Sequence, residues 1–386
     1  MKKESIYLDN NATTPVDSVV IEAMLPYFTE RYGNPSSLHS KGTEAERAVS
    51  NVRYQLAELL GVKESEVVFT SGATESLNTA ILGIARANKR KGRHIVTTAV
   101  EHDAVLSSCQ VLEEEGWEVS YLKTDQYGMV TPEQVSEVVR EDTALVAVMQ
   151  VNNELGTINP VNDIAYAVKK KKDDVYVVVD GVQAFGKMSV DLTHIDAYAI
   201  SAHKFHGPKG VGALVVKEGV KQRMKPLIVG GGQEFGIRSG TQNVPAIVGL
   251  GKAVELAYSN LRQNRDHIQN LREYLLSVFT QIDDVVINSP ESGLETTLNV
   301  SFLGVSAETL LHTLEEKGVY FSTGSACSTN NKIKSHVLEH VTDRQDVKNS
   351  SVRFGLSRLN TTEEIENASQ IVREAVEELR SATRTV

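Results

Sequence analysis

The amino-acid sequence predicts an α/β fold, with a mostly parallel β-sheet flanked by helices and a smaller α+β region after it. Over the first 240 residues, short β-branched or apolar runs alternate with helical segments. This alternation is typical of a parallel sheet with helices on both faces. After residue 240 the pattern changes to one long amphipathic stretch at 245–280. At 386 residues the chain is also long enough for two or three domains.

The first region consists of strand-length runs separated by helical patterns. Right-handed crossovers would bring the carboxyl ends of parallel strands to one edge of the sheet, where α/β proteins bind ligands. We therefore expect functional residues just after these runs. The predicted strands are 66–70, 94–100, 117–122, 144–151, 175–180 and 198–201, and the clearest helices between them are 73–90 and 104–115.

The region after residue 260 is predicted to be a smaller α+β domain. The stretch 245–280 carries apolar side chains at helical spacing, among them Leu261, Ile268 and Leu275. A strand at 297–303 and helices at 307–317 and 362–381 are expected to follow it. We predict a large domain of residues 15–259 and a small domain formed by residues 1–14 and 260–386.

The composition excludes several classes of function. A net charge of −10 is the opposite of what a protein that binds nucleic acid through its phosphates normally carries. No apolar run approaches the roughly 20 residues that span a bilayer, and the first residues lack the apolar core of a secretory signal. The only cysteines, Cys109 and Cys327, cannot by themselves form a disulfide framework or a structural zinc site. We expect a cytoplasmic protein without membrane or direct nucleic-acid partners.

Two short motifs imitate known sites. The segment 181–187 has P-loop spacing, but Met188 replaces the hydroxyl residue that binds magnesium, and 189–191 is expected to be a strand instead of a helix. The segment 336–340, HVLEH, matches a zinc-enzyme pattern. Such an enzyme needs a third ligand and a domain built around the helix, so we expect two exposed histidines beside packed apolar residues. We predict no metal site.

The residues that indicate chemistry lie at predicted strand ends. Asp180 ends the buried run 175–180, and Lys204 follows the run 198–201, where a solubilising charge is unexpected. Small residues at 71–76 open a helix whose first N–H groups favour an anion. Taken alone, Asp180 is explained equally well as the cap of a turn. Together these features favour a pyridoxal phosphate enzyme, in which a lysine makes the Schiff base and an acid keeps the pyridinium nitrogen protonated.

Seven motifs, spread along essentially the whole chain, are YLDNNATTP at 7–15, GNPSS at 33–37, EH at 101–102, VNNE at 151–154, GIRSGT at 236–241, SACS at 325–328 and VRF at 352–354. In this order they resemble the cysteine desulfurases of the NifS/IscS type, in class V of the fold-type I pyridoxal phosphate enzymes. The resemblance implies that the chain converts L-cysteine to L-alanine and leaves a persulfide on an enzyme cysteine. That sulfur would pass to an iron–sulfur scaffold or a thiolation enzyme.

The resemblance also implies which residues act around the cofactor ring. Lys204 forms the Schiff base and, once displaced by the substrate, moves the Cα proton. His102 stacks on the ring and takes part in acid–base steps, although without the motifs it would pass for a surface histidine. Asp180 pairs with the pyridine nitrogen, and Gln183 reaches the ring hydroxyl.

A second group of residues is implied for the cofactor phosphate. Ala73, through its backbone, is expected to bind the phosphate together with Thr74, Ser201 and His203. Thr241 is expected to reach the same phosphate from the second subunit, so the resemblance implies a homodimer.

The substrate is expected to meet a carboxylate-binding pair and a reactive thiol. Asn153, which also belongs to the cofactor site, and Arg353 bind the carboxylate in this resemblance, and the arginine fork suits that task. Cys327 lies among small and polar residues, which predicts a mobile loop at about 321–335 with a nucleophilic thiol. Cys109 has apolar neighbours on a predicted helix and is expected to be inert.

Two alternatives compete with the desulfurase interpretation. A selenocysteine lyase or another class V enzyme such as an aminotransferase would keep the cofactor but change the reaction. A non-catalytic partner in a sulfur pathway would keep the fold alone. Retention of both Lys204 and Cys327 favours an active desulfurase.

Overall fold

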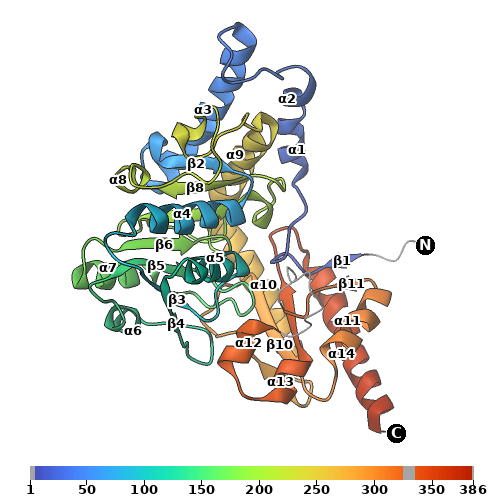
Figure 1. Ribbon diagram of the computed structural model, residues 1–386. Coiled ribbons are helices and arrows are strands. Elements are labelled where there is room, and N and C mark those ends of the chain that lie inside the picture. Colours follow the sequence, from blue (N-terminus) through green and yellow to red (C-terminus); the bar gives the residue numbers. More distant parts are fainter. Residues whose placement is uncertain (1–4, 325–334, 385–386) are drawn as a thin grey trace.

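The computed structural model describes residues 5–324 and 335–384 and contains a seven-stranded sheet with the order β2-β8-β7-β6-β5-β3-β4 (Figure 1). Only β8 runs antiparallel to its neighbours in this sheet; the remaining adjacent pairs are parallel. The prediction of a mostly parallel sheet is confirmed. The strands are β2 (Val67–Thr70), β3 (His94–Thr98), β4 (Glu118–Leu122), β5 (Thr143–Met149), β6 (Tyr176–Asp180), β7 (Ala197–Ser201) and β8 (Gly212–Val216).

Both faces of this sheet are buried, which explains why its strands read as continuous apolar runs. Val177 and Val179 face one core, whereas Val178 faces the other, as the two-residue period of a strand requires. Helices α4 and α5 cover the second face, and α3, α7 and α9 cover the first. The helices of this region are α1 (Ser18–Met24), α2 (Pro26–Thr29), α3 (Ser40–Leu60), α4 (Ala73–Asn88), α5 (Asp103–Glu114), α6 (Pro132–Glu137), α7 (Val161–Lys171), α8 (Glu218–Lys221) and α9 (Val244–Ser259).

A second region is built on the antiparallel sheet β12-β10-β9, and a short pair joins β1 to β11 in parallel. Its core, which includes Phe279, also contains Ile6 and Leu8 from the start of the chain. The exact division into domains stays a prediction. The elements are β1 (Ile6–Tyr7), α10 (Leu261–Phe279), β9 (Val285–Ile287), β10 (Thr297–Phe302), α11 (Ala307–Glu316), β11 (Val319–Tyr320), α12 (His336–Val341), α13 (Gln345–Ser350), β12 (Ser351–Gly355) and α14 (Thr362–Arg384).

Three local expectations were wrong. The stretch 245–280 is two helices, because Asn260 leaves the helical conformation between α9 and α10. Residues 189–191 form no strand, since the Asp191 carboxylate accepts hydrogen bonds from the backbone and hydroxyl of Thr193 and closes a turn. His336 is half-buried and not exposed, and its Nε2 lies 2.8 Å from a backbone carbonyl oxygen.

No helix within residues 5–324 and 335–384 is long and apolar enough to cross a membrane. In the same part of the chain, no three acidic, histidine or cysteine side chains gather as a metal site would require.

Candidate active site

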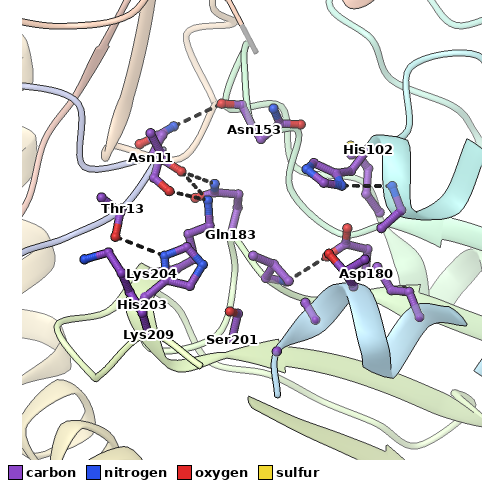
Figure 2. A pocket seen from close by; sticks show the side chains of 18 of the residues that line it. Asn11, Thr13, His102, Asn153, Asp180, Gln183, Ser201, His203, Lys204 and Lys209 are labelled. Atoms are coloured by element: carbon purple, nitrogen blue, oxygen red, sulfur yellow. Dashed lines mark hydrogen bonds between the residues drawn. The ribbon is translucent and has the colours of Figure 1, made fainter. Parts of the chain in front are cut away.

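A cavity of about 400 Å³ lies at the carboxyl ends of β5, β6 and β7 (Figure 2). This volume falls in the usual range of small-molecule sites. The edge of the sheet is the one that the crossover argument predicted. The predicted site residues that line the cavity are Ala73, Thr74, His102, Asn153, Asp180, Gln183, Ser201, His203, Lys204 and Arg353.

Two predicted site residues are not in this group. Thr241 is exposed in the segment before α9 and does not line the cavity of its own chain. Cys327 and most of its expected loop lie outside the described residues.

Lys204 occupies a one-turn 3₁₀ helix directly after β7. Its ammonium group donates to the carbonyl oxygens of Asn11 at 2.7 Å and Ala12 at 2.9 Å. The N-terminal segment thus closes one side of the cavity, as Figure 2 shows at Asn11. We did not predict this contact, although the motif at 7–15 contains both carbonyl groups.

Asp180 faces the cavity from the end of β6 and is 7 % exposed. Burial raises the pKa of its carboxyl group, while the positive charge of Lys204 and the hydrogen bond from the Val182 backbone act in the opposite direction. One carboxylate oxygen accepts from the Val182 backbone at 3.0 Å. The remaining acceptor capacity suits a protonated ring nitrogen.

His102 is the N-cap of α5, where its Nδ1 accepts a hydrogen bond from the Ala104 backbone at 3.1 Å. A nitrogen that accepts carries no proton, so the neutral ring holds its proton on Nε2. The cap fixes the ring at the edge of the cavity.

One end of the cavity is suited to an anion, and we call it the phosphate end: residues 71–74, Ser201 and His203. The helix α4 begins there, so its first N–H groups and its dipole face the cavity. His203 Nδ1 lies 3.1 Å from Thr13 Oγ1. Burial, with help from the nearby positive charges of Lys204 and Lys209, lowers the pKa of His203 to about 4. His203 is therefore neutral at pH 7.

Gly212 explains why the phosphate end can be so compact. A Cβ atom on this residue would lie 2.3 Å from the Ile200 carbonyl oxygen and 2.8 Å from the Cα of Gly72. Neither backbone atom can move without breaking the sheet. Glycine at position 212 thus lets the turn after β2 pack against β8.

The other end, which we call the carboxylate end, is formed by Asn153 and Arg353, and Asp9 contacts Arg353 from outside the cavity lining. Arg353 is 1 % exposed on β12 and donates to the Asn153 carbonyl oxygen and to the Asp9 carboxylate, both at 3.0 Å. Its Nε atom and the Asn153 Oδ1 atom are buried without a hydrogen-bond partner among the described residues. Burial raises the pKa of Asp9, although the charge of Arg353 opposes this.

A buried N–H group of a guanidinium without a partner is costly and is normally satisfied by a ligand or water. The Arg353 guanidinium lines the cavity, and it is a group from which a carboxylate is well suited to accept. Sequence reasoning placed Asn153 and Arg353 here but missed Asp9.

Cys109 is fully buried on α5. Burial raises the pKa of its thiol to about 12. Because the thiolate is the reactive form, a thiol with this pKa is inert near neutral pH. The predicted packing of Cys109 is confirmed.

Comparison with known proteins gives the family. A sequence profile of the aminotransferase class-V family matches residues 6–368. The cysteine desulfurase IscS of Methanosarcina thermophila is 43% identical over 383 residues, which are 98% of this chain and 94% of the relative. The chain belongs to the aminotransferase class-V family.

Solved structures agree with this membership. A NifS-like protein superposes with a TM-score of 0.91 at 40% identity, covering 97% of this chain and 100% of that one. SspA, described in complex with cysteine, superposes with a TM-score of 0.82 at 35% identity, covering 92% of this chain and 100% of that one. Within the class-V family, the chain therefore groups with cysteine desulfurases.

Pyridoxal phosphate fits the residues that line the cavity. Lys204 supplies an amine, Asp180 a buried carboxylate, and the phosphate end the start of a helix. These are the partners that an aldehyde, a pyridine nitrogen and a phosphate require. The class-V family and the donor set of the cavity thus agree on the type of cofactor.

Proposed function

We propose that this chain is a pyridoxal phosphate-dependent L-cysteine desulfurase that forms L-alanine and a persulfide on Cys327. The observation that supports this most strongly is one cavity that joins Lys204, Asp180 and the buried Arg353 guanidinium. A reactive amine, a partner for the ring nitrogen and a partner for an α-carboxylate are the groups that chemistry on an amino acid needs. The cysteine desulfurases among the relatives give the reaction class.

The chain's own residues divide the reaction between them. When bound, pyridoxal phosphate supplies an electron sink for the charge that develops at the substrate Cα. Arg353 and Asn153 hold the substrate carboxylate and so orient the Cα–H bond toward Lys204. The Lys204 amine accepts the Cα proton and later returns a proton to the product. His102, with its proton on Nε2, provides a further acid–base group.

Sulfur transfer needs a second nucleophile. The Cys327 thiolate bonds to the substrate Sγ while the Cβ–Sγ bond breaks, and a proton is then added at Cβ. The sum is L-cysteine plus an enzyme thiol giving L-alanine plus an enzyme persulfide, which balances in atoms and electrons. An iron–sulfur scaffold or a thiolation enzyme in the cytoplasm would then accept the sulfur.

A homodimer is the second part of the proposal. Large apolar side chains are exposed on and just after α1 and α2: Leu25 at 57 %, Phe28 at 57 %, Tyr32 at 67 % and Leu38 at 101 %. Thr241 lies shortly before α9, which packs against α1. A second copy of the chain covering this surface would remove the apolar groups from water and bring Thr241 toward the partner's phosphate end.

The alternative functions are distinguished by their products and by whether the protein binds the cofactor. Purified protein with pyridoxal phosphate is incubated with L-cysteine, and alanine, keto acids and sulfide are quantified. Alanine as the main product supports the desulfurase, whereas a keto acid formed from L-cysteine only when a second keto acid is supplied to accept the amino group would identify an aminotransferase. Turnover of selenocysteine with negligible turnover of cysteine would identify a selenocysteine lyase. Protein that binds no cofactor would instead be a non-catalytic partner.

A further inference from the structure

Lys187 lies behind the active-site cavity and follows Gln183 by four residues in the sequence. Its Nζ atom donates to Gln183 Oε1 at 2.6 Å. Gln183 lines the active-site cavity, but Lys187 does not. It lines a separate cavity of about 40 Å³, which Lys204 also borders. Any influence of Lys187 on the cavity contents therefore passes through Gln183 or through its charge.

The partners of Gln183 determine which way its amide points. An ammonium group only donates, and a backbone carbonyl only accepts. Gln183 Oε1 meets the Lys187 ammonium, and its Nε2 donates to the Asn11 carbonyl oxygen at 3.0 Å. The flipped amide would place two donors against each other at Lys187 and two acceptors against each other at Asn11. One orientation is therefore selected, with Nε2 as the donor on the side opposite Lys187.

The two constraints on Gln183 are not equivalent. The Asn11 carbonyl oxygen also accepts from Lys204, the lysine expected to react. It is thus shared with a group whose bonding changes during the reaction. The Lys187 bond involves no proposed reacting group.

We propose that Lys187 is a positioning residue, which holds the Gln183 amide so that its N–H group is directed at the ring oxygen of the bound cofactor. This rests on the proposed function, because it takes from it the cofactor and the contact between Gln183 and the ring hydroxyl. In its ammonium form, Lys187 also draws electron density toward Oε1, which makes the amide N–H a stronger donor. A negatively charged ring oxygen is then stabilised more than a protonated one.

The surroundings of Lys187 support a specific role for its charge. Burial lowers the pKa of Lys187 to about 7, and the positive charges of Lys204 and Arg353 act in the same direction, while Glu295 opposes them. His206, Arg265 and Arg358 also border the small cavity, where Arg265 pairs with Glu295 and Arg358 with Asp17. A cation buried near Lys204 and Arg353 is costly. Its hydrogen bond to Gln183 is a contact that offsets part of this cost.

The test compares Lys187→Met, which removes the donor, with Lys187→Arg, which keeps one. Lys169→Met is the matched control, because Lys169 is also partly buried and donates to Asp196 at 2.6 Å, away from the cavity. The readouts are the dissociation constant for pyridoxal phosphate and the pH midpoint at which the visible band of the bound cofactor changes. Neither is an activity.

For Lys187→Met we expect about 3- to 10-fold weaker cofactor binding, the scale of one hydrogen bond. The pH midpoint should rise, since the deprotonated ring oxygen loses stabilisation. Lys187→Arg should restore most of both effects, and Lys169→Met should resemble the parent protein. An unchanged midpoint in a folded, cofactor-loaded Lys187→Met protein contradicts the proposal.

A double-mutant cycle separates positioning from general stability. In a Gln183→Ala background, Lys187→Met should change the dissociation constant for pyridoxal phosphate less than twofold. The pH midpoint should change correspondingly little. Equal effects in both backgrounds would show that Lys187 acts independently of Gln183 and would overturn the proposal. If the parent protein binds no cofactor, the proposed function fails; if it binds and the cycle is additive, only the role of Lys187 fails.

Discussion

The phosphate end and the carboxylate end of the cavity are built in different ways. The phosphate end comes from the turn after β2 and the end of β7, both in the seven-stranded sheet. The carboxylate end joins the N-terminal segment, the loop after β5 and β12 of the second sheet. One sheet fixes the geometry of the first end, whereas the packing between two regions fixes the second. Cofactor binding and substrate binding should therefore be separable by mutation.

The largest effect is expected from Lys204→Ala, because Lys204 supplies the amine that is proposed to act as nucleophile and base. Loss of the amine should lower alanine formation by on the order of 10⁴-fold or more, as removal of a nucleophile and base does in other enzymes. Borohydride should no longer fix the cofactor to the protein. Peptide mapping of the reduced parent protein checks the position, and a pyridoxyl group on any lysine other than Lys204 would refute the assignment.

A smaller and selective effect is expected from Arg353→Lys. The variant keeps the charge but loses the planar fork and its buried Nε donor. Since hydrogen bonds to charged groups contribute about 1.5–3 kcal/mol, KM for L-cysteine should rise about 10- to 100-fold. Cofactor affinity should stay within about twofold of the parent value, as the phosphate end is untouched.

The matched control for that change is Arg344→Lys just before α13, where Arg344 pairs with Asp346 away from the cavity. Its KM should equal that of the parent protein. If Arg353→Lys weakens cofactor binding as much as it raises KM, the two ends are coupled and the comparison is wrong.

Ser201→Ala at the phosphate end is expected to do the opposite: it should weaken cofactor binding and leave KM for L-cysteine unchanged. The Ser201 hydroxyl would donate to the phosphate anion, and a hydrogen bond to a charged group contributes about 1.5–3 kcal/mol, so cofactor affinity should fall about 10- to 100-fold. KM measured at saturating cofactor should not change. Equilibrium binding of pyridoxal phosphate to the apoprotein measures the first quantity. A raised KM with unchanged cofactor affinity would place Ser201 at the wrong end.

The same difference explains what the sequence allowed us to predict. Asp180 and Lys204 could be paired because they follow neighbouring buried strands, and the geometry of a parallel sheet brings such ends together. No comparable rule connects Arg353 with Asn153, and only the resemblance to cysteine desulfurases did so. Asp9 was missed because its contact with Arg353 joins segments 344 residues apart.

The sequence also failed to predict where a helix is interrupted and where a turn replaces a strand. The turn at Asp191 depends on one polar side chain that competes with regular structure. At Asn260 the backbone leaves the helical conformation without a side-chain cap. The contact between Lys187 and Gln183 was not predicted, because it lies in a turn whose sequence resembles a P-loop.

The smallest effect on the reaction is expected from Glu101→Gln beneath the cavity. Burial raises the pKa of Glu101 to about 8, whereas the unfolded group titrates near 4.5. The folded chain thus keeps a proton that the unfolded chain loses, so this contribution to stability is complete below pH 4.5 and declines as the pH rises to about 8. Glutamine resembles the protonated acid and cannot ionise.

Relative to the parent protein, Glu101→Gln should therefore gain roughly 1–3 kcal/mol in the free energy of unfolding between pH 5 and pH 7.5. Urea unfolding at several pH values measures this difference. A parallel pH dependence in the two proteins would show that Glu101 is ionised in the folded state.

The central claim, sulfur transfer through the cavity to Cys327, is tested most directly by mapping the persulfide. The cofactor-loaded protein is treated with L-cysteine, its thiols are trapped by alkylation, and peptides are identified by mass spectrometry while alanine is quantified. We predict persulfide on Cys327, normal alanine formation by Cys109→Ala, and cofactor binding without alanine formation by Cys327→Ala. Persulfide mainly on Cys109, or full alanine formation by Cys327→Ala, would contradict the account.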